Sequence, residues 1–173
     1  DMNIEDMIAD QQMVISLTHS GYVKRLPLVT YRQQHRGGVG VMGMEMKEDD
    51  YIEHLHICST HDFLLFFTNR GKVYRLKVYE LPEGARTAKG RALVNVLPLR
   101  EGEKVTAVIP TRDFGEKKYL VFATTQGLVK KTEFMAYNTK IKADGIIAIK
   151  VRPGDELVGV RLTSGDEDLL LVS

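Results

Sequence analysis

The stretch VISLTHSGYVKRL at residues 14–26 decides the fold, because it recurs twice further along the chain. It returns as LLFFTNRGKVYRL at residues 64–76 and as LVFATTQGLVKKT at residues 120–132. In each copy a Thr-x-x-Gly step joins two apolar runs, and its glycine can adopt the positive φ that a tight turn requires. The stretch therefore predicts three hairpins, and its recurrence every 50 to 56 residues indicates a repeat architecture.

Each hairpin is followed by a tyrosine, a glycine that opens an apolar run, an acidic turn and a last apolar run. Short segments rich in Val, Ile, Leu, Phe and Tyr between glycine-bearing turns are typical of strands, and little room is left for helices. The predicted strands are 13–18, 22–26, 39–44 and 52–58; 63–68, 72–76, 92–97 and 104–110; and 119–124, 128–132, 146–151 and 156–162. The domain organisation is a lead-in at 1–12, with a helical turn expected at 3–9, then repeats at 13–62, 63–118 and 119–168 and the start of a fourth at 169–173.

Four-stranded units of about 50 residues are typical of the blades of a propeller-like all-β fold. Immunoglobulin-like sandwiches are the structural alternative, but each would need about 100 residues. Closed propellers have about four to eight blades, so three blades and one strand would form an arc with exposed edges. We therefore expect this chain to be part of a larger disc.

Composition sets the broad class of the protein. The chain has 173 residues, of which 43% are hydrophobic, so it can bury a core. A single cysteine, Cys58, suits a reducing cytoplasm. No apolar run is long enough to cross a bilayer, and residues 1–10 are acidic where a signal peptide would be basic, so the sequence predicts a cytoplasmic protein without membrane contact.

Charge is segregated by position in the repeat, although the net charge is only +1. Residues 21–40, 70–91 and 127–142 hold 15 of the 24 Lys and Arg but only three of the 23 Asp and Glu. Equivalent positions in successive blades form a continuous band, which would suit a polyanion. The alternative is solvated edge protection, which does not explain why the acids avoid these windows. We call the candidate contacts the basic rim: Lys24, Arg25, Arg32, Lys72, Arg75, Arg86, Lys89, Arg91, Lys130, Lys131, Lys140 and Lys142.

A glycine-rich segment lies between the second and third strands of the first repeat. Its residues are Gln34, His35, Arg36, Gly37, Gly38, Val39 and Gly40. Such a loop lets backbone N–H groups approach a phosphate, and an arginine adds charge-assisted hydrogen bonds. It lacks the Gly-Lys-Ser/Thr ending of a nucleotide loop. The alternative is an ordinary connection between strands.

A metal site and a catalytic site are two further alternatives. His54, His56 and Cys58 alternate, so on a strand they share one face, but they lack a second ligand pair at zinc spacing. We therefore expect no metal. No serine, cysteine or carboxylate stands in a nucleophile motif, so we expect no catalytic residue and no cofactor. The recurring tyrosines are interpreted as packing residues: Tyr22, Tyr31, Tyr74, Tyr79 and Tyr137.

Across nearly its whole length the chain resembles the C-terminal domain of DNA gyrase A subunits, which are type IIA topoisomerases. The likeness rests on five segments, at residues 4–8, 21–27, 66–74, 86–90 and 159–163. It also rests on Gln34–Gly40, which lies at the position of the gyrase A box of the family. That box usually reads Gln-Arg/Lys-Arg-Gly-Gly-Arg/Lys-Gly. His35 and Val39 depart from the basic residues of that pattern.

The resemblance implies a six-bladed β-pinwheel, in which blades exchange strands. It also implies a non-catalytic domain that wraps duplex DNA around a basic rim and presents a segment for strand passage and negative supercoiling. The implied partners are largely sequence-independent duplex DNA, the N-terminal cleavage domain of the same subunit, and the gyrase B subunit in an A2B2 holoenzyme that hydrolyses ATP. The implied location is the bacterial cytoplasm, in association with the nucleoid.

Two alternatives remain open. The two departures in the box keep the related topoisomerase IV A subunit in view, because its equivalent domain carries a degenerate or missing box. From a different class, a propeller-like scaffold could use the basic band to bind an acidic protein partner.

Overall fold

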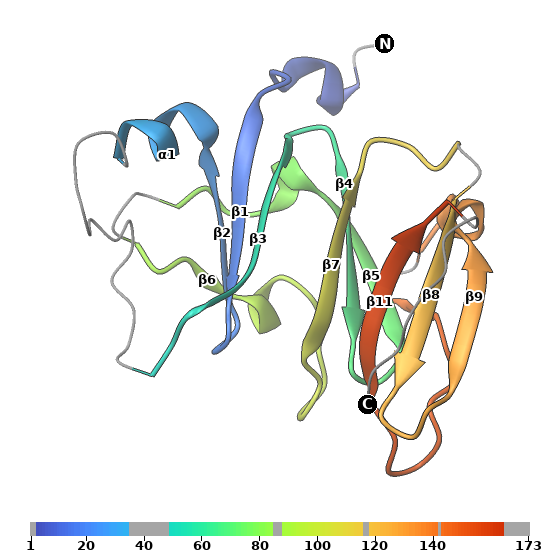
Figure 1. The fold of residues 1–173 in the computed structure, drawn as a ribbon. Helices are drawn as coiled ribbons and strands as arrows, with labels where there is room; N and C mark the ends of the chain where they lie inside the picture. Colours follow the sequence, from blue (N-terminus) through green and yellow to red (C-terminus); the bar gives the residue numbers. More distant parts are fainter. Residues whose placement is uncertain (1–2, 35–48, 85–87, 116–117, 142, 165–173) are drawn as a thin grey trace.

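The computed structural model describes residues 3–34, 49–84, 88–115, 118–141 and 143–164, and its strands form three antiparallel sheets that stand side by side (Figure 1). The strands are β1 (Gln12–Thr18), β2 (Tyr22–Pro27), β3 (Ile52–Ser59), β4 (Phe63–Thr68), β5 (Lys72–Lys77), β6 (Arg91–Ala92), β7 (Val105–Thr111), β8 (Tyr119–Thr124), β9 (Val129–Glu133), β10 (Ile146–Ile147) and β11 (Leu157–Thr163). Within these ranges the helices are α1 (Leu28–Gln34) and four short 3-10 helices, η1 (Ile4–Met7), η2 (Val78–Glu80), η3 (Leu93–Asn95) and η4 (Phe134–Tyr137). No helix of the described residues is long and apolar enough to cross a bilayer.

The three predicted hairpins are present as β1–β2, β4–β5 and β8–β9. Their marker glycines Gly21, Gly71 and Gly127 have φ of 92°, 79° and 87°. Each donates its N–H to the threonine three residues earlier, at 2.9 to 3.0 Å. The Thr-x-x-Gly step therefore forms the tight turn expected from the sequence.

Each complete sheet combines strands from two successive repeats. The first sheet has the order β3-β1-β2-β6 and the second β10-β5-β4-β7, so β6 and β10 pair with the repeat before their own. The third sheet has the order β11-β8-β9 in the described part of the chain. Four strands per repeat were predicted, and the exchange of one strand between blades was implied by the family resemblance. Both are confirmed for the sheets that contain β6 and β10.

The exchanged strands β6 and β10 define one edge of the first and of the second sheet. β3, β7 and β11, the last strands of the three repeats, lie at the opposite edge, where β7 contacts both β3 and β11. We call this the inner edge and the edge formed by β6 and β10 the outer edge. In the first two sheets the second strand of the repeat, which is part of a basic window, therefore lies next to the outer edge, and in the described residues β9 is itself the edge strand of the third sheet.

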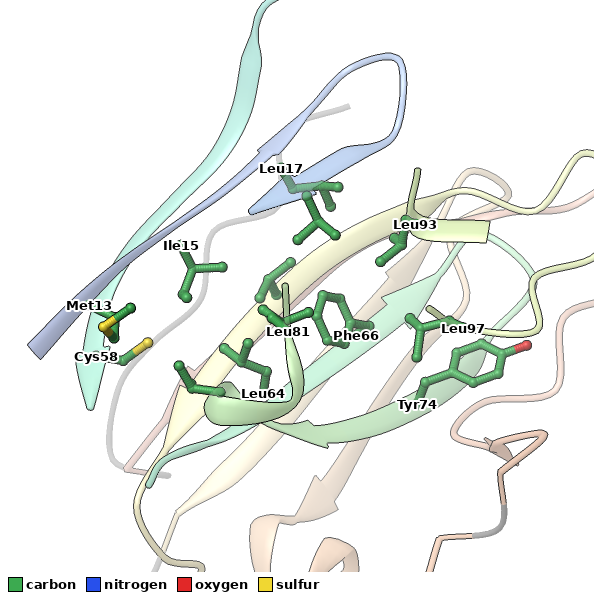
Figure 2. Packing of buried hydrophobic residues seen from close by; sticks show 13 residues of the cluster. Met13, Ile15, Leu17, Cys58, Leu64, Phe66, Tyr74, Leu81, Leu93 and Leu97 are labelled. Carbon is green, nitrogen blue, oxygen red and sulfur yellow. The ribbon is translucent and has the colours of Figure 1, made fainter. Parts of the chain in front are cut away.

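Two hydrophobic cores separate the three blades. The first core lies between the first and second sheets and contains Leu64 and Phe66 of β4 (Figure 2). The second core lies between the second and third sheets and contains Leu65 and Phe67. Successive residues of a strand point to opposite faces, so β4 is buried on both sides. This double burial explains its uninterrupted apolar sequence.

The structure corrects three predictions of secondary structure. The strand expected at 92–97 ends at Ala92, and the chain continues as η3. Leu93 and Leu97 are buried, whereas Val94 and Asn95 between them are exposed. That spacing is helical rather than alternating. The strand expected at 146–151 ends at Ile147. A helical turn was expected only at 3–9, but the seven-residue helix α1 follows β2. The strand expected at 39–44 and the fourth repeat at 169–173 lie outside the described residues.

The lead-in forms the expected helical turn and is fastened to the first two blades. Asn3 caps η1, and Asp10 accepts hydrogen bonds from Ser59 and from Arg112. Lys77 of β5 lies 3.1 Å from the carboxylate of Glu5. These contacts tie residues 3–11 to the end of the sheets opposite the hairpin turns (Figure 1).

Candidate nucleic-acid interface

Strand exchange brings basic segments of different repeats together at the outer edge. Tyr22 pairs with Ala92 and Val23 pairs with Arg91, and Arg25 exchanges backbone hydrogen bonds with Pro82 and Gly84, so the described parts of this stretch of the second repeat, 82–84 and 88–93, lie along β2 of the first. In the same way Lys72 of β5 pairs with Ile147 of the third repeat. Two basic windows that are about 50 residues apart in the sequence thus form one surface.

Six residues of the predicted rim are exposed to solvent in the described part of the chain. Lys89 and Arg91 belong to the segment that crosses β2, and Lys130 and Lys131 belong to β9. Lys72 is half-buried. The exposed rim residues are Arg32, Lys89, Arg91, Lys130, Lys131 and Lys140.

Four rim residues donate hydrogen bonds to backbone carbonyls of the protein, and one of them, Lys130, stays exposed while its ammonium donates to the carbonyl of Ala148 at 3.0 Å. Lys24 is buried and its ammonium donates to the carbonyl oxygen of Ala88 at 2.8 Å. Arg25 donates from Nε to the carbonyl of Leu81 at 2.7 Å, and Arg75 donates from Nη1 to the carbonyl of Tyr137 at 2.8 Å. Burial lowers the pKa of Lys24 and of Arg75. We therefore leave Lys24, Arg25 and Arg75 out of the surface that we propose below.

Two of the exposed lysines rest on tyrosine rings. The ammonium of Lys89 lies 4.4 Å from the centroid of Tyr22, and that of Lys131 lies 4.3 Å from the centroid of Tyr119. A cation over an aromatic face is held in place by the ring quadrupole. This role of the two rings was not predicted from the sequence. Hairpin register could have revealed the second pair, because Lys131 lies opposite Val121 and hence diagonally from Tyr119.

Part of the predicted site lies outside the described residues. Gln34 is the last residue of α1. The other box residues, His35, Arg36, Gly37, Gly38, Val39 and Gly40, are outside the described ranges, as are Arg86 and Lys142 of the rim.

Carboxylates of the acidic turns fold back onto the hairpin turns, at the other end of the sheets from the lead-in. Asp50 accepts from the N–H of Ser20, and Glu103 accepts from the hydroxyls of Thr68 and Tyr74. Asp155 accepts from the hydroxyl of Thr125 at 2.6 Å. The sequence predicted these turns but indicated no role for their acids. The hydrogen bonds explain why an acid recurs there in all three repeats.

His54, His56 and Cys58 share one face of β3, as predicted. They pair with Leu17, Ile15 and Met13, whose side chains belong to the first core. Burial lowers the pKa of both histidines and raises that of Cys58 to about 12. In the ranges that the structure describes, no group of three or more His, Cys, Asp or Glu could hold a metal ion.

Comparison with known proteins agrees with this architecture. The sequence model of the DNA gyrase C-terminal domain, a β-propeller, matches residues 12–59, 62–112 and 118–164. The DNA gyrase A subunit of Halalkalibacterium halodurans is 49% identical over 96% of this chain, and that of Escherichia coli is 46% identical over all of it. The chain spans about a fifth of the length of these relatives.

Two solved structures are similar over most of the chain. The C-terminal domain of a DNA topoisomerase IV has a TM-score of 0.80 at 32% identity and covers 92% of this chain, which spans 48% of that structure. A DNA gyrase A C-terminal domain has a TM-score of 0.66 at 25% identity and covers 88% of this chain, again spanning 48% of that structure. From its blades, its exchanged strands and its match over all three repeats, the chain belongs to the DNA gyrase C-terminal domain family.

Proposed function

We propose that this chain is a non-catalytic domain of a gyrase A subunit that binds duplex DNA along the outer edges of its blades. The observation that carries the proposal is that strand exchange places exposed Lys89 and Arg91 along β2 and that exposed Lys130 and Lys131 lie on the edge strand β9, while the turn carboxylates bond to the hairpin turns. Several exposed cations on the outer strands of neighbouring blades would match the regular negative charge of a duplex.

The contacts should be made mainly to phosphates. The one α-helix in the described residues has seven residues, and it does not offer the recognition helix with which many proteins read the major groove. Lysine and arginine contacts to the backbone supply affinity and orientation but carry no base information. Competition between unrelated duplexes of equal length tests this, and a preference above about a thousandfold would contradict it.

The parent protein that we propose is a type IIA topoisomerase. In it six such blades would complete the disc, the N-terminal part of the subunit would cleave DNA, and a B subunit in an A2B2 assembly would hydrolyse ATP. The complex would act on DNA in the bacterial cytoplasm, at the nucleoid. The similarity to gyrase A subunits at 46 to 49% identity supports this assignment.

We propose different roles for the basic rim and for the box at Gln34–Gly40. The rim supplies affinity, and the box fixes the end of the wrapped duplex. Neutralising Lys130 and Lys131 should weaken binding to any duplex and make the salt dependence shallower by about 0.9 per contact. Changing Arg36, Gly37 and Gly38 to alanine should instead abolish DNA bending and negative supercoiling, with much of the binding to short duplexes retained.

The test measures end-to-end fluorescence transfer on a long duplex and supercoiling by the intact enzyme. Arginine at His35 and Val39 should strengthen bending if these positions face phosphate. A box variant that bends and supercoils DNA like the unmodified protein would show that the box has another role. If affinity does not rise with duplex length, the basic edge serves an acidic protein partner instead.

Topoisomerase IV is the second candidate. The TM-score of 0.80 with a topoisomerase IV domain favours it, as do the two departures in the box, while the identity to gyrase A subunits favours gyrase. The products distinguish them: gyrase would introduce negative supercoils into a relaxed plasmid, whereas an enzyme that only relaxes and unlinks DNA would be topoisomerase IV.

A further inference from the structure

Lys24 occupies an unusual place for a lysine at a basic edge. It lies on β2 opposite Ser16 of β1, and only 5% of its surface is exposed. A buried ammonium is costly unless it is hydrogen-bonded, and here it donates to the carbonyl of Ala88, 64 residues further along the chain. The bond therefore fastens the exchanged segment to the sheet that receives it.

The aliphatic part of Lys24 lies directly beneath that segment. A β-carbon built on Gly84 would lie 2.7 Å from Cδ of Lys24, and one built on Gly90 would lie 3.1 Å from its Cβ. Gly90 also has a φ of 98° and lies against the carbonyl oxygen of Val23, where a side chain would collide. The segment thus packs on the lysine stem through two glycines, one on each side of Ala88.

The same segment carries two exposed cations. Lys89 follows Ala88 directly and lies over the ring of Tyr22, and Arg91 begins β6 opposite Val23. Beyond them the N–H of Leu93 donates to the carbonyl of Gly21 at 2.7 Å. Hydrogen bonds therefore hold the backbone on both sides of Lys89 and Arg91, one from Lys24 and the other to the hairpin turn.

We propose that Lys24 is a positioning residue for DNA binding, and that its buried ammonium holds Ala88 so that Lys89 and Arg91 act as one phosphate-binding pair on the outer edge. The pair binds phosphates of duplex DNA, so the inference rests on the proposed function. Lys24 itself touches no phosphate. Removing one buried charge should therefore cost the phosphate contacts of two other residues.

The test compares Lys24→Met with the double variant K89A/R91A in the intact protein, by hydrogen exchange at 88–93 and by the salt dependence of binding to a long duplex. Lys24→Met should accelerate exchange and make the slope of log K against log salt shallower by about 1.8, the value for two contacts. K89A/R91A should change the slope equally without accelerating exchange at Leu93. Adding Lys24→Met to K89A/R91A should change the slope no further.

Two matched variants complete the design. Lys131→Met removes an exposed lysine of the third blade, opposite Val121, and should change the slope by about 0.9 with no effect on exchange at 88–93. Gly84→Ala keeps every charge but pushes on the Lys24 stem, and it should accelerate exchange and make the slope shallower. It also tests the proposal if Lys24→Met does not fold.

The outcomes separate this inference from the function on which it rests. A slope change of about 0.9 with unchanged exchange in Lys24→Met would mean that Lys24 contacts phosphate, and the positioning role would be wrong. Faster exchange with an unchanged slope would equally overturn it. If K89A/R91A and Lys131→Met both leave DNA affinity unchanged, the proposed function itself fails.

Discussion

At the scale of single residues, Asp155 makes stability sensitive to acid. Desolvation pushes the pKa of Asp155 up, but hydrogen bonds from Thr125, Thr124 and the N–H groups of Gln126 and Glu156 outweigh it and hold the pKa at about 2. The ordinary value is 3.8. Because the folded state favours the carboxylate, its contribution is complete above about pH 4 and is lost as the pH falls towards 2. We expect the melting temperature to fall over this interval.

Asp155→Asn should make the melting temperature less dependent on pH between about pH 4 and pH 2. Thermal unfolding from pH 5 to pH 2 measures this. Glu101→Gln is the control, because Glu101 is an exposed acid in the equivalent turn of the second repeat. An unchanged profile in Asp155→Asn would contradict the role assigned to this carboxylate.

Alanine substitutions at two marker glycines distinguish the cost of backbone strain from the cost of a steric collision. Gly127 has a φ of 87° and open space, with nothing within 4 Å, where a β-carbon would stand, whereas Gly71, at 79°, lies against the carbonyl of Ile149. Gly127→Ala should cost about 1–2 kcal/mol for the left-handed conformation. Gly71→Ala should cost about 1–3 kcal/mol more, because the neighbouring backbone must move. Chemical denaturation measures both, and equal losses would refute the collision.

The limits of sequence reasoning are clear at Lys24, Arg25 and Arg75. Their positions in a basic window predicted surface cations, but each donates to a backbone carbonyl more than 50 residues away. Those acceptors belong to other repeats and leave no trace in the local sequence pattern. By contrast, the shared face of His54, His56 and Cys58 followed from alternation alone.

At the scale of elements, the burial of β4 on both faces predicts that two adjacent residues of this strand contribute about equally to the free energy of unfolding. Phe66→Ala should destabilise the first core and Phe67→Ala the second, each by about 3–5 kcal/mol. Ile57 of β3 is 57% exposed, so Ile57→Ala should change stability by about 0.5 kcal/mol or less. Equilibrium unfolding measures the three values. A small loss for either phenylalanine variant would mean that one face of β4 is not closed.

Long strands could be predicted from the sequence, whereas short elements could not. β1, β4 and β8 are apolar runs bounded by a glycine turn, so their ends were predicted to within one residue. β6 and β10 have two residues each, too few for any period to develop. The family resemblance implied that blades exchange strands, but residue pattern alone does not say which sheet a short strand joins.

At the scale of the whole molecule, the third sheet leaves an edge for association. In the described residues β9 pairs with β8 alone, and Val129 of β9 is 49% exposed. An unpaired strand edge can accept another chain. We expect the 173-residue chain by itself to self-associate as its concentration rises, and Val129→Pro to reduce this, as measured by sedimentation velocity. A strictly monomeric chain at millimolar concentration with fully cooperative unfolding would contradict the expectation.

Strand exchange also bears on how such an array can change in length. The unit that repeats in the sequence is offset from the unit that folds, since β6 and β10 complete the sheets of the preceding repeats. A duplicated repeat inserted in the middle would lend a strand to the blade before it and receive one from the blade after it. Every internal sheet would remain complete, and only the two terminal blades would lack a neighbour. Gene duplication could therefore lengthen or shorten the array by whole repeats without remodelling any blade.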